Sequence, residues 1–130
     1  MQSEIPPEAP STTGSTSPED PGGRAARDIA DVPSAEIITT AAVHLMSAAA
    51  VKCGLAEGED VDRHLDLAEA RILINALAGL VTAAAPDIGG THARALRDGL
   101  RTLQLAFREA STHPDPPGRG PGERLTGSVV

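Results

Sequence analysis

The sequence is almost without aromatic residues: it has no Trp or Tyr, and Phe107 is its one Phe. Large aromatic side chains contribute much of the buried area in many protein cores, so a core here must be built from Ala, Leu, Ile and Val. The chain also has a single cysteine, Cys53, which excludes an intramolecular disulfide. A disulfide-stabilised fold is therefore excluded, and the core of a monomer is expected to be thin.

The sequence lacks a signal-peptide pattern and a long uninterrupted apolar run. Its N-terminus has neither a basic segment nor an apolar stretch. The longest apolar runs, 41–51 and 72–85, are interrupted by polar residues and fall short of the roughly 18 residues that a membrane-spanning helix needs. These features predict a cytoplasmic protein that makes no contact with a membrane.

Proline and glycine are concentrated at the two ends of the chain. Residues 1–33 hold six of the eleven Pro, and residues 112–130 hold four Pro and four Gly. Segments of this composition bury too little apolar surface to offset the conformational entropy lost on ordering. We therefore predict a disordered acidic tail over 1–33, a folded domain over 34–111 and a disordered tail over 112–130.

The chain is acidic, with a formal net charge of −7. Residues 1–33 carry six acids and two Arg, whereas residues 34–111 carry ten acids against seven bases. An acidic balance disfavours non-specific binding to nucleic acid or anionic lipid, although a local basic patch can override it.

Three segments of the middle region have helical periodicity. The first is expected to begin after Ser34, a suitable cap, and to end at Gly54. The second should start near Asp62 and stop before Pro86, and the third should follow Thr91, a candidate N-cap. Short links between helices favour antiparallel neighbours, so we predict an all-α protein, a small three-helix antiparallel bundle.

The first two helices are too apolar for such a unit to stand alone. From Ile72 onward the second helix carries only Asn75 and Thr82 as polar side chains, which leaves most of its circumference apolar. We expect a second copy of the chain to cover this surface, giving at least a dimer. The alternative is that Ala-rich faces tolerate water and the monomer is adequate. The candidate self-association residues are Leu77, Gly79, Leu80 and Ala83.

The third helix is amphipathic, with an apolar face opposite a stripe of arginines. Arg97 and Arg101 are four apart, a like-charge spacing that costs an isolated helix on the order of a few tenths of a kcal/mol. This stripe suggests an alternative function, contact with RNA or the translation machinery. No aromatic residue interleaves with the arginines, which weakens a base-stacking model. The candidate contact residues are Arg94, Arg97, Arg101 and Arg108.

No motif indicates catalysis, a metal or a cofactor. His44 and Cys53 are nine apart, which places them on opposite sides of one helix, too far apart to share a metal ion. Cys53 lies at a helix C-terminus, where the dipole opposes a thiolate, so we interpret it as a buried structural residue. We predict a non-enzymatic protein without a cofactor or a small-molecule substrate, and leave open a pH-sensitive contact at His44.

The three helical segments together resemble a known family. "AEIITTAAVHLMSAAAVKCGL", "DLAEARILINALAGLVTAAAPDI" and "ALRDGLRTLQLAFREAS" are similar to a small bacterial family, the domain of unknown function number eighteen-forty-four, in its actinobacterial form. The resemblance spans residues 34–111 and implies a helical bundle in the bacterial cytoplasm, with no site residue to carry over. The sequence departs from the commoner family pattern at "VTAAAPDIGG", where that pattern has a charged stretch.

These features favour a small self-associating interaction module without enzymatic activity. A homo-oligomer is the expected assembly, and a different protein partner is an alternative to it.

Overall fold

The computed structural model describes residues 29–55, 58 and 61–130. Ser34–Val130 form one compact unit, and Met1–Pro33 belong to a second. The predicted disordered tail over 1–33 lies outside the described residues except for 29–33. There the Val32 N–H donates to the Ile29 carbonyl at 3.1 Å and closes a turn.

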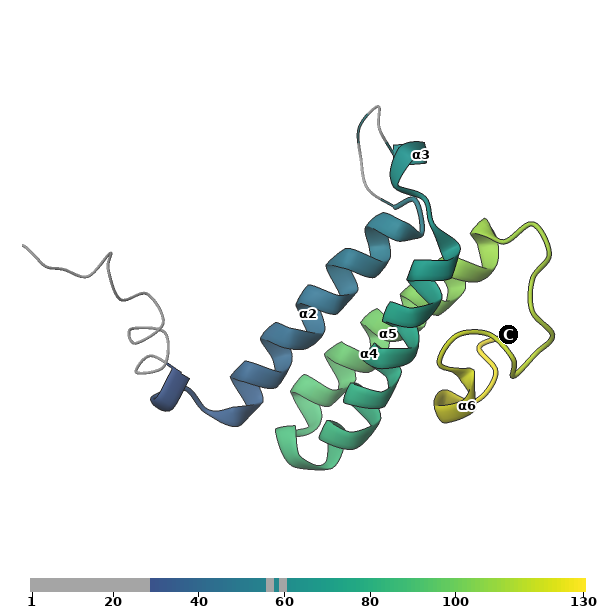
Figure 1. Cartoon of the computed structure of the whole chain (residues 1–130). Coiled ribbons are helices and arrows are strands. Elements are labelled where there is room, and N and C mark those ends of the chain that lie inside the picture. Colours follow the sequence, from purple (N-terminus) through teal and green to yellow (C-terminus); the bar gives the residue numbers. More distant parts are fainter. Residues whose placement is uncertain (1–28, 56–57, 59–60) are drawn as a thin grey trace, which may run out of the picture. The chain divides into compact units, whose positions relative to one another are not determined.

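Every regular element in the described ranges is a helix, which confirms the predicted all-α class. Two elements are single turns, α3 (Val61–His64) and α6 (Glu123–Thr126). Three helices are long, and each contacts the other two (Figure 1). They are α2 (Ser34–Lys52), α4 (Leu67–Ile88) and α5 (Gly90–Ala110).

The ends of α2 follow the sequence prediction. The helix begins at Ser34, and Glu36 lies in its first turn, where the helix dipole favours a negative charge. After Lys52 the chain turns away at Gly54, whose φ of 84° is readily adopted only by glycine. The Gly54 N–H donates to the Val51 carbonyl at 3.1 Å, so Gly54 ends the helix as predicted.

The predicted boundaries of the second helix are wrong at both ends. The long helix begins at Leu67, because the extended Asp66 caps it and accepts the Glu69 N–H at 3.1 Å. Asp62 lies instead in the single turn α3. At the other end α4 continues through Pro86 to Ile88. Proline is tolerated there because Pro86 is exposed in the last turn, where water can hydrate the carbonyl left without a donor.

The turn into α5 also differs from the prediction. The chain reverses direction at Gly89, which has a φ of 90° and separates α4 from α5 by itself (Figure 1). Gly89 is the N-cap and no side chain caps the helix, so the prediction of Thr91 as the cap is wrong. Thr91 lies within the first turn of α5.

The core is built mainly from small and aliphatic side chains. The largest fully buried ones are Ile74, Leu77 and Val81 of α4. Phe107, the single aromatic residue, is buried on α5. The buried positions on α2 are Ala42 and Ala49, so this helix contributes little volume to the core. The three helices alone make a thin core, as the composition predicted.

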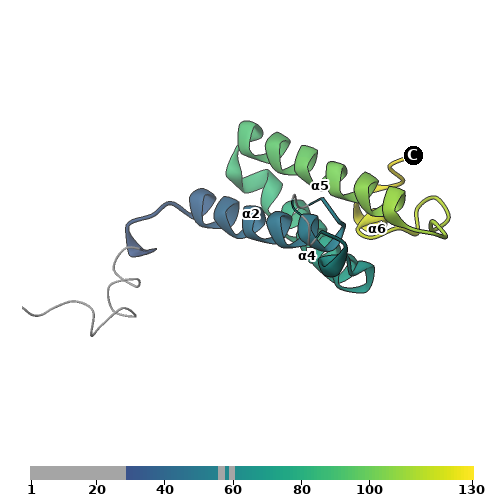
Figure 2. The same ribbon diagram turned by 90° about the horizontal axis from the view of Figure 1, so that it is seen from above.

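The prediction of a disordered tail over 112–130 is wrong. This C-terminal segment leaves the end of α5, turns back alongside that helix and reaches α4 (Figures 1 and 2). Pro121, Gly122, Glu123 and Val129 are buried. The segment needs no core of its own, because polar side chains on α4 and α5 bind its backbone and its glycines form the turns.

Candidate interaction surfaces

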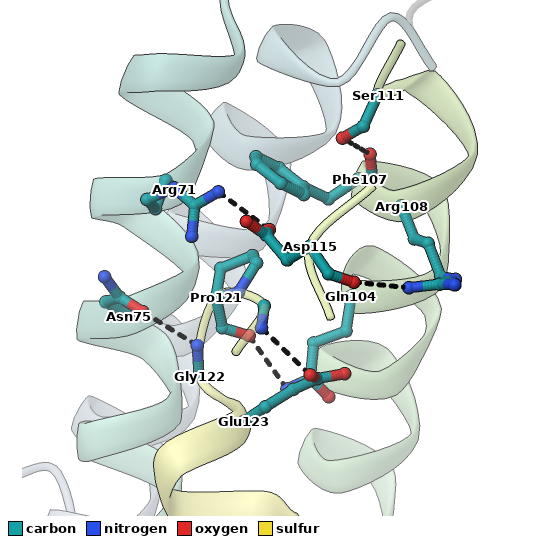
Figure 3. Close-up of polar contacts among 11 residues, drawn as sticks. Arg71, Asn75, Gln104, Phe107, Arg108, Ser111, Asp115, Pro121, Gly122 and Glu123 are labelled. Carbon is teal, nitrogen blue, oxygen red and sulfur yellow. Dashed lines mark hydrogen bonds and ion pairs between the residues drawn. The ribbon is translucent and has the colours of Figure 1, made fainter. Parts of the chain in front are cut away.

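The C-terminal segment is hydrogen-bonded to α4 at Gly122. The Asn75 Oδ1 atom accepts the Gly122 N–H at 2.7 Å (Figure 3). Gly122 has a φ of 75°, and a Cβ atom added to it would lie 2.9 Å from the Ala78 Cβ. The backbone therefore approaches α4 more closely than any residue with a side chain would allow.

A buried glutamine fastens the same segment to α5. Gln104 is 3% exposed, and its Nε2 atom donates to the Pro121 carbonyl and to the Thr126 hydroxyl, each at 3.0 Å. Its Oε1 atom is buried and finds no hydrogen-bond donor among the described residues. An unpartnered buried acceptor is unusual in folded proteins.

A buried glutamate shapes the end of the segment. Glu123 is 6% exposed, and its two carboxylate oxygens accept backbone N–H groups: Oε1 from Gly120 at 2.9 Å and Oε2 from Val129 at 3.1 Å. These bonds tie both sides of the single turn α6 together. A buried carboxylate is stable when its oxygens are hydrogen-bonded in this way.

Two arginines bind the segment at Asp115. The Arg71 Nη2 atom lies 2.8 Å from Asp115 Oδ2, and the Arg108 Nη1 atom donates to the Asp115 carbonyl at 3.0 Å (Figure 3). The Arg71 guanidinium also stacks 4.9 Å from the centre of the Phe107 ring. Asp115 therefore receives one arginine from α4 and one from α5.

The arginine stripe predicted on the third helix is divided by these contacts. Arg94 and Arg97 are exposed. Arg101, although exposed, donates to the Val129 carbonyl at 3.3 Å, and Arg108 is half-buried against Asp115. Two of the four guanidinium groups therefore already bind the chain's own C-terminal segment.

One side of α4 is left uncovered by α2, α5 and the C-terminal segment. We call this surface the α4 face; Ile72 is 61% exposed on it, and a Cβ atom added to Gly79 would meet nothing within 4 Å. Its residues recur every three or four positions, as one side of a helix requires. They are Ala68, Ile72, Ala76, Gly79 and Ala83.

The predicted self-association residues divide between this face and the interior. Gly79 and Ala83 lie on the α4 face, and Leu80 is half-buried beside it. Leu77 is 0% exposed and packs inside the chain, so it is not available to a partner. It lies about 160° around the helix from Gly79, so helical geometry turns it inward.

The outer surface of α2 mixes apolar and polar residues, with Thr40 and Ser47 among the exposed polar ones. Ile37 and Val43 are exposed, whereas Met46 points inward to α5, where its Sδ atom would lie 2.8 Å from a Cβ on Gly99. His44 is exposed on the outer side. Both α2 and α4 are long and apolar enough to cross a membrane by length and composition, a test that core helices of soluble proteins also pass.

Cys53 is a free thiol at the end of α2, and it is buried as predicted. Burial raises the pKa of the thiol above its ordinary value of 9.0, because the charged thiolate is poorly solvated there. Within the described ranges, no three His, Cys, Asp or Glu side chains gather where they could share a metal ion.

Sequence reasoning missed the residues that hold the C-terminal segment. Asn75 and Arg71 are polar residues on a mostly apolar helix, and Gln104 interrupts the apolar side of α5. A buried polar side chain needs a hydrogen-bond partner, and Gln104 is the buried one of these three. Their presence was a signal that another segment lies against these helices.

The fold defines an all-α domain of three long helices with an added C-terminal segment. The chain belongs to the family described as Domain of unknown function (DUF1844), which matches residues 34–109. This match confirms the family suggested by the helical sequences. It spans α2 to the end of α5 and stops before the C-terminal segment. No curated protein and no solved structure matches the chain.

Proposed function

We propose that the protein is a non-enzymatic helical module that self-associates. In this proposal α2, α4 and α5 form an antiparallel three-helix unit, and two copies join through α4 and the outer side of α2. The main support is the α4 face, an uncharged row of apolar residues on the surface of α4.

The residue sizes on the α4 face favour another helix as the occupant. Ala76, Gly79 and Ala83 are small, and the distance between two packed helices depends on the side chains at their contact. The open space around Gly79 would admit a side chain of a partner helix. Ile72, at the edge of this row, supplies a larger apolar group for burial.

We propose that a second copy of the chain covers the α4 face. A surface without charge and with small apolar residues is complementary to itself, and a two-fold dimer places the same surface on both sides of the interface. The exposed Ile37 and Val43 of α2 extend the apolar area beyond α4. An apolar surface of this kind on a soluble domain commonly marks an interaction site.

The proposal is tested by placing a charge on the α4 face. Because Ile72 is exposed in the single chain, Ile72→Lys leaves folding intact and places an unpaired charge in the interface. Sedimentation velocity should show a weaker dimer, with its dissociation constant raised at least about tenfold, or about 1.4 kcal/mol. Leu105→Lys, an exposed leucine on α5, is the matched control and should leave assembly unchanged. Equal sedimentation of both variants and the unaltered chain would refute the proposed interface.

We further propose that the module acts in the bacterial cytoplasm. The apolar character of α2 and α4 that fits a membrane span equally fits an interface between copies. The alternative function, RNA contact through α5, would rest on Arg94 and Arg97, since Arg101 and Arg108 donate to carbonyls of the C-terminal segment.

A further inference from the structure

A cleft of about 410 Å³ lies between α4, α5 and the end of the C-terminal segment. Its apolar walls come from all three parts of the fold: Val81 of α4, Leu100 of α5, and Leu125 and Val129 of the C-terminal segment. Its volume falls within the range of about 300–1,000 Å³ that small-molecule sites occupy. The cleft shares no residue with the α4 face.

The polar groups of the cleft favour an anion. Arg97 and Arg101 both line it, one helical turn apart on α5, and Asp98 is the acid beside them. The two arginines against one aspartate leave a positive balance, in a chain whose formal net charge is −7. Like charges four residues apart repel, so an anion between the two guanidinium groups would relieve this repulsion and accept charge-assisted hydrogen bonds.

A buried amide forms part of the wall of the same cleft. Gln104 lines the cleft and is 3% exposed, yet its Oε1 atom has no donor within the described part of the chain. Its Nε2 atom is committed to the Pro121 carbonyl and the Thr126 hydroxyl, which fixes the orientation of the amide. The amide is therefore a fixed part of the wall beside the two arginines.

We propose that this cleft binds a small amphipathic anion. Its carboxylate lies between Arg97 and Arg101, and its apolar body lies against Val81, Leu100 and Leu125. No sequence pattern indicates such a ligand, because the cleft exists only once the C-terminal segment has folded back onto α5. This proposal does not depend on self-association.

Sodium octanoate is the probe, with octanamide as its uncharged analogue. The full chain labelled with ¹⁵N is titrated with each compound, and amide shifts are followed by NMR. We expect saturable shifts with octanoate around the cleft, at Arg97, Leu100 and Leu125, and binding of octanamide at least tenfold weaker. An absence of saturable shifts with octanoate, or equal binding of octanamide, would overturn the proposal.

Substitutions locate the charge contact. Arg97→Gln should weaken octanoate binding at least fivefold, and adding Arg101→Gln should weaken it further. Arg94→Gln is the control, because Arg94 is exposed on the same helix and does not line the cleft. The amide shifts of Gly122 and Val129 report whether the C-terminal segment stays docked when the Val129 contact of Arg101 is removed. If Arg94→Gln weakens binding as much as Arg97→Gln, general electrostatic attraction explains the binding and the site is refuted.

Discussion

Asn75 of α4 accepts the N–H of Gly122 at 2.7 Å, although the two residues are 47 positions apart in the chain. This contact shows what covers one side of the apolar helix α4. The cover is the chain's own C-terminal segment, which reaches past α5. It buries part of the surface that a partner was expected to bury. The remaining uncovered side is the α4 face.

Gly122→Ala should loosen the C-terminal segment. The substitution forces a side chain into a left-handed conformation, and the new Cβ would lie 2.9 Å from the Ala78 Cβ. Gly118→Ala is the matched control, because Gly118 has a φ of 83° but open space around an added Cβ. We expect Gly122→Ala to lower the free energy of unfolding by about 1–2 kcal/mol more than the control in urea titrations. Equal losses would show that the close approach to α4 contributes nothing.

Asn75→Ala should leave the buried Gly122 N–H without an acceptor. Removing one partner of a buried hydrogen bond costs about 1–3 kcal/mol, so the free energy of unfolding should fall by that amount. Asn75→Asp keeps an oxygen acceptor at the same place and should retain most of the stability. Amide exchange at Gly122 distinguishes the two variants: protection should be lost in the first and kept in the second. Unchanged protection in Asn75→Ala would contradict the assigned role.

The boundaries that could be predicted from the sequence depended on local chemistry. Gly54 ends α2 because the turn needs a positive φ, and that requirement involves only neighbouring residues. The start of α4 was misplaced because Asp62 and Asp66 are both suitable caps, and it is the Asp66 side chain that accepts the Glu69 N–H. The C-terminal segment could not be predicted from its Pro and Gly content, because its stability comes from distant residues. Asn75 and Gln104 are two such distant residues, and their side chains bind the backbone of the segment.

The candidate sites also divide into features set by neighbouring residues and features set by distant ones. The small residues of the α4 face could be found from helical periodicity alone, but the inward position of Leu77 required the packing of all three helices. The spacing of the arginines of α5 puts them on one side of the helix. Their division into exposed Arg94 and Arg97 and the bonded Arg101 and Arg108 depends on the C-terminal segment.

Cys53 should make stability depend on alkaline pH. Burial raises the pKa of its thiol in the folded chain above the ordinary value of 9.0. The unfolded chain therefore releases the proton first, so the stabilising contribution is complete below that value and is lost as the pH rises toward the folded pKa. We expect the free energy of unfolding to fall between pH 8 and about pH 10 more steeply than in Cys53→Ala. Parallel pH profiles would contradict a buried thiol.

RNA binding through α5 should be weak while the C-terminal segment is docked. Two exposed arginines on a single strand give a slope of log affinity against log salt of about −1.4, whereas four would give about −2.8. Filter binding of oligouridylate at several salt concentrations measures this slope. A slope near the larger value would show that Arg101 and Arg108 leave the segment for phosphate, and would support the RNA function over self-association alone.

The most direct test of self-association compares the solution masses of the full chain and Gly79→Leu. A Cβ added at Gly79 would meet nothing within 4 Å, and leucine favours the helix over glycine by about 1 kcal/mol, so the single chain should stay folded and as stable or more so. In a dimer the same leucine would push the two α4 helices apart. Ala95→Leu, at an exposed position on α5, is the control. By light scattering at tens of micromolar, we predict a mass near twice 13.3 kDa for the unaltered chain and the control, and near 13.3 kDa for Gly79→Leu. A mass of 13.3 kDa for the unaltered chain at every concentration would contradict the account.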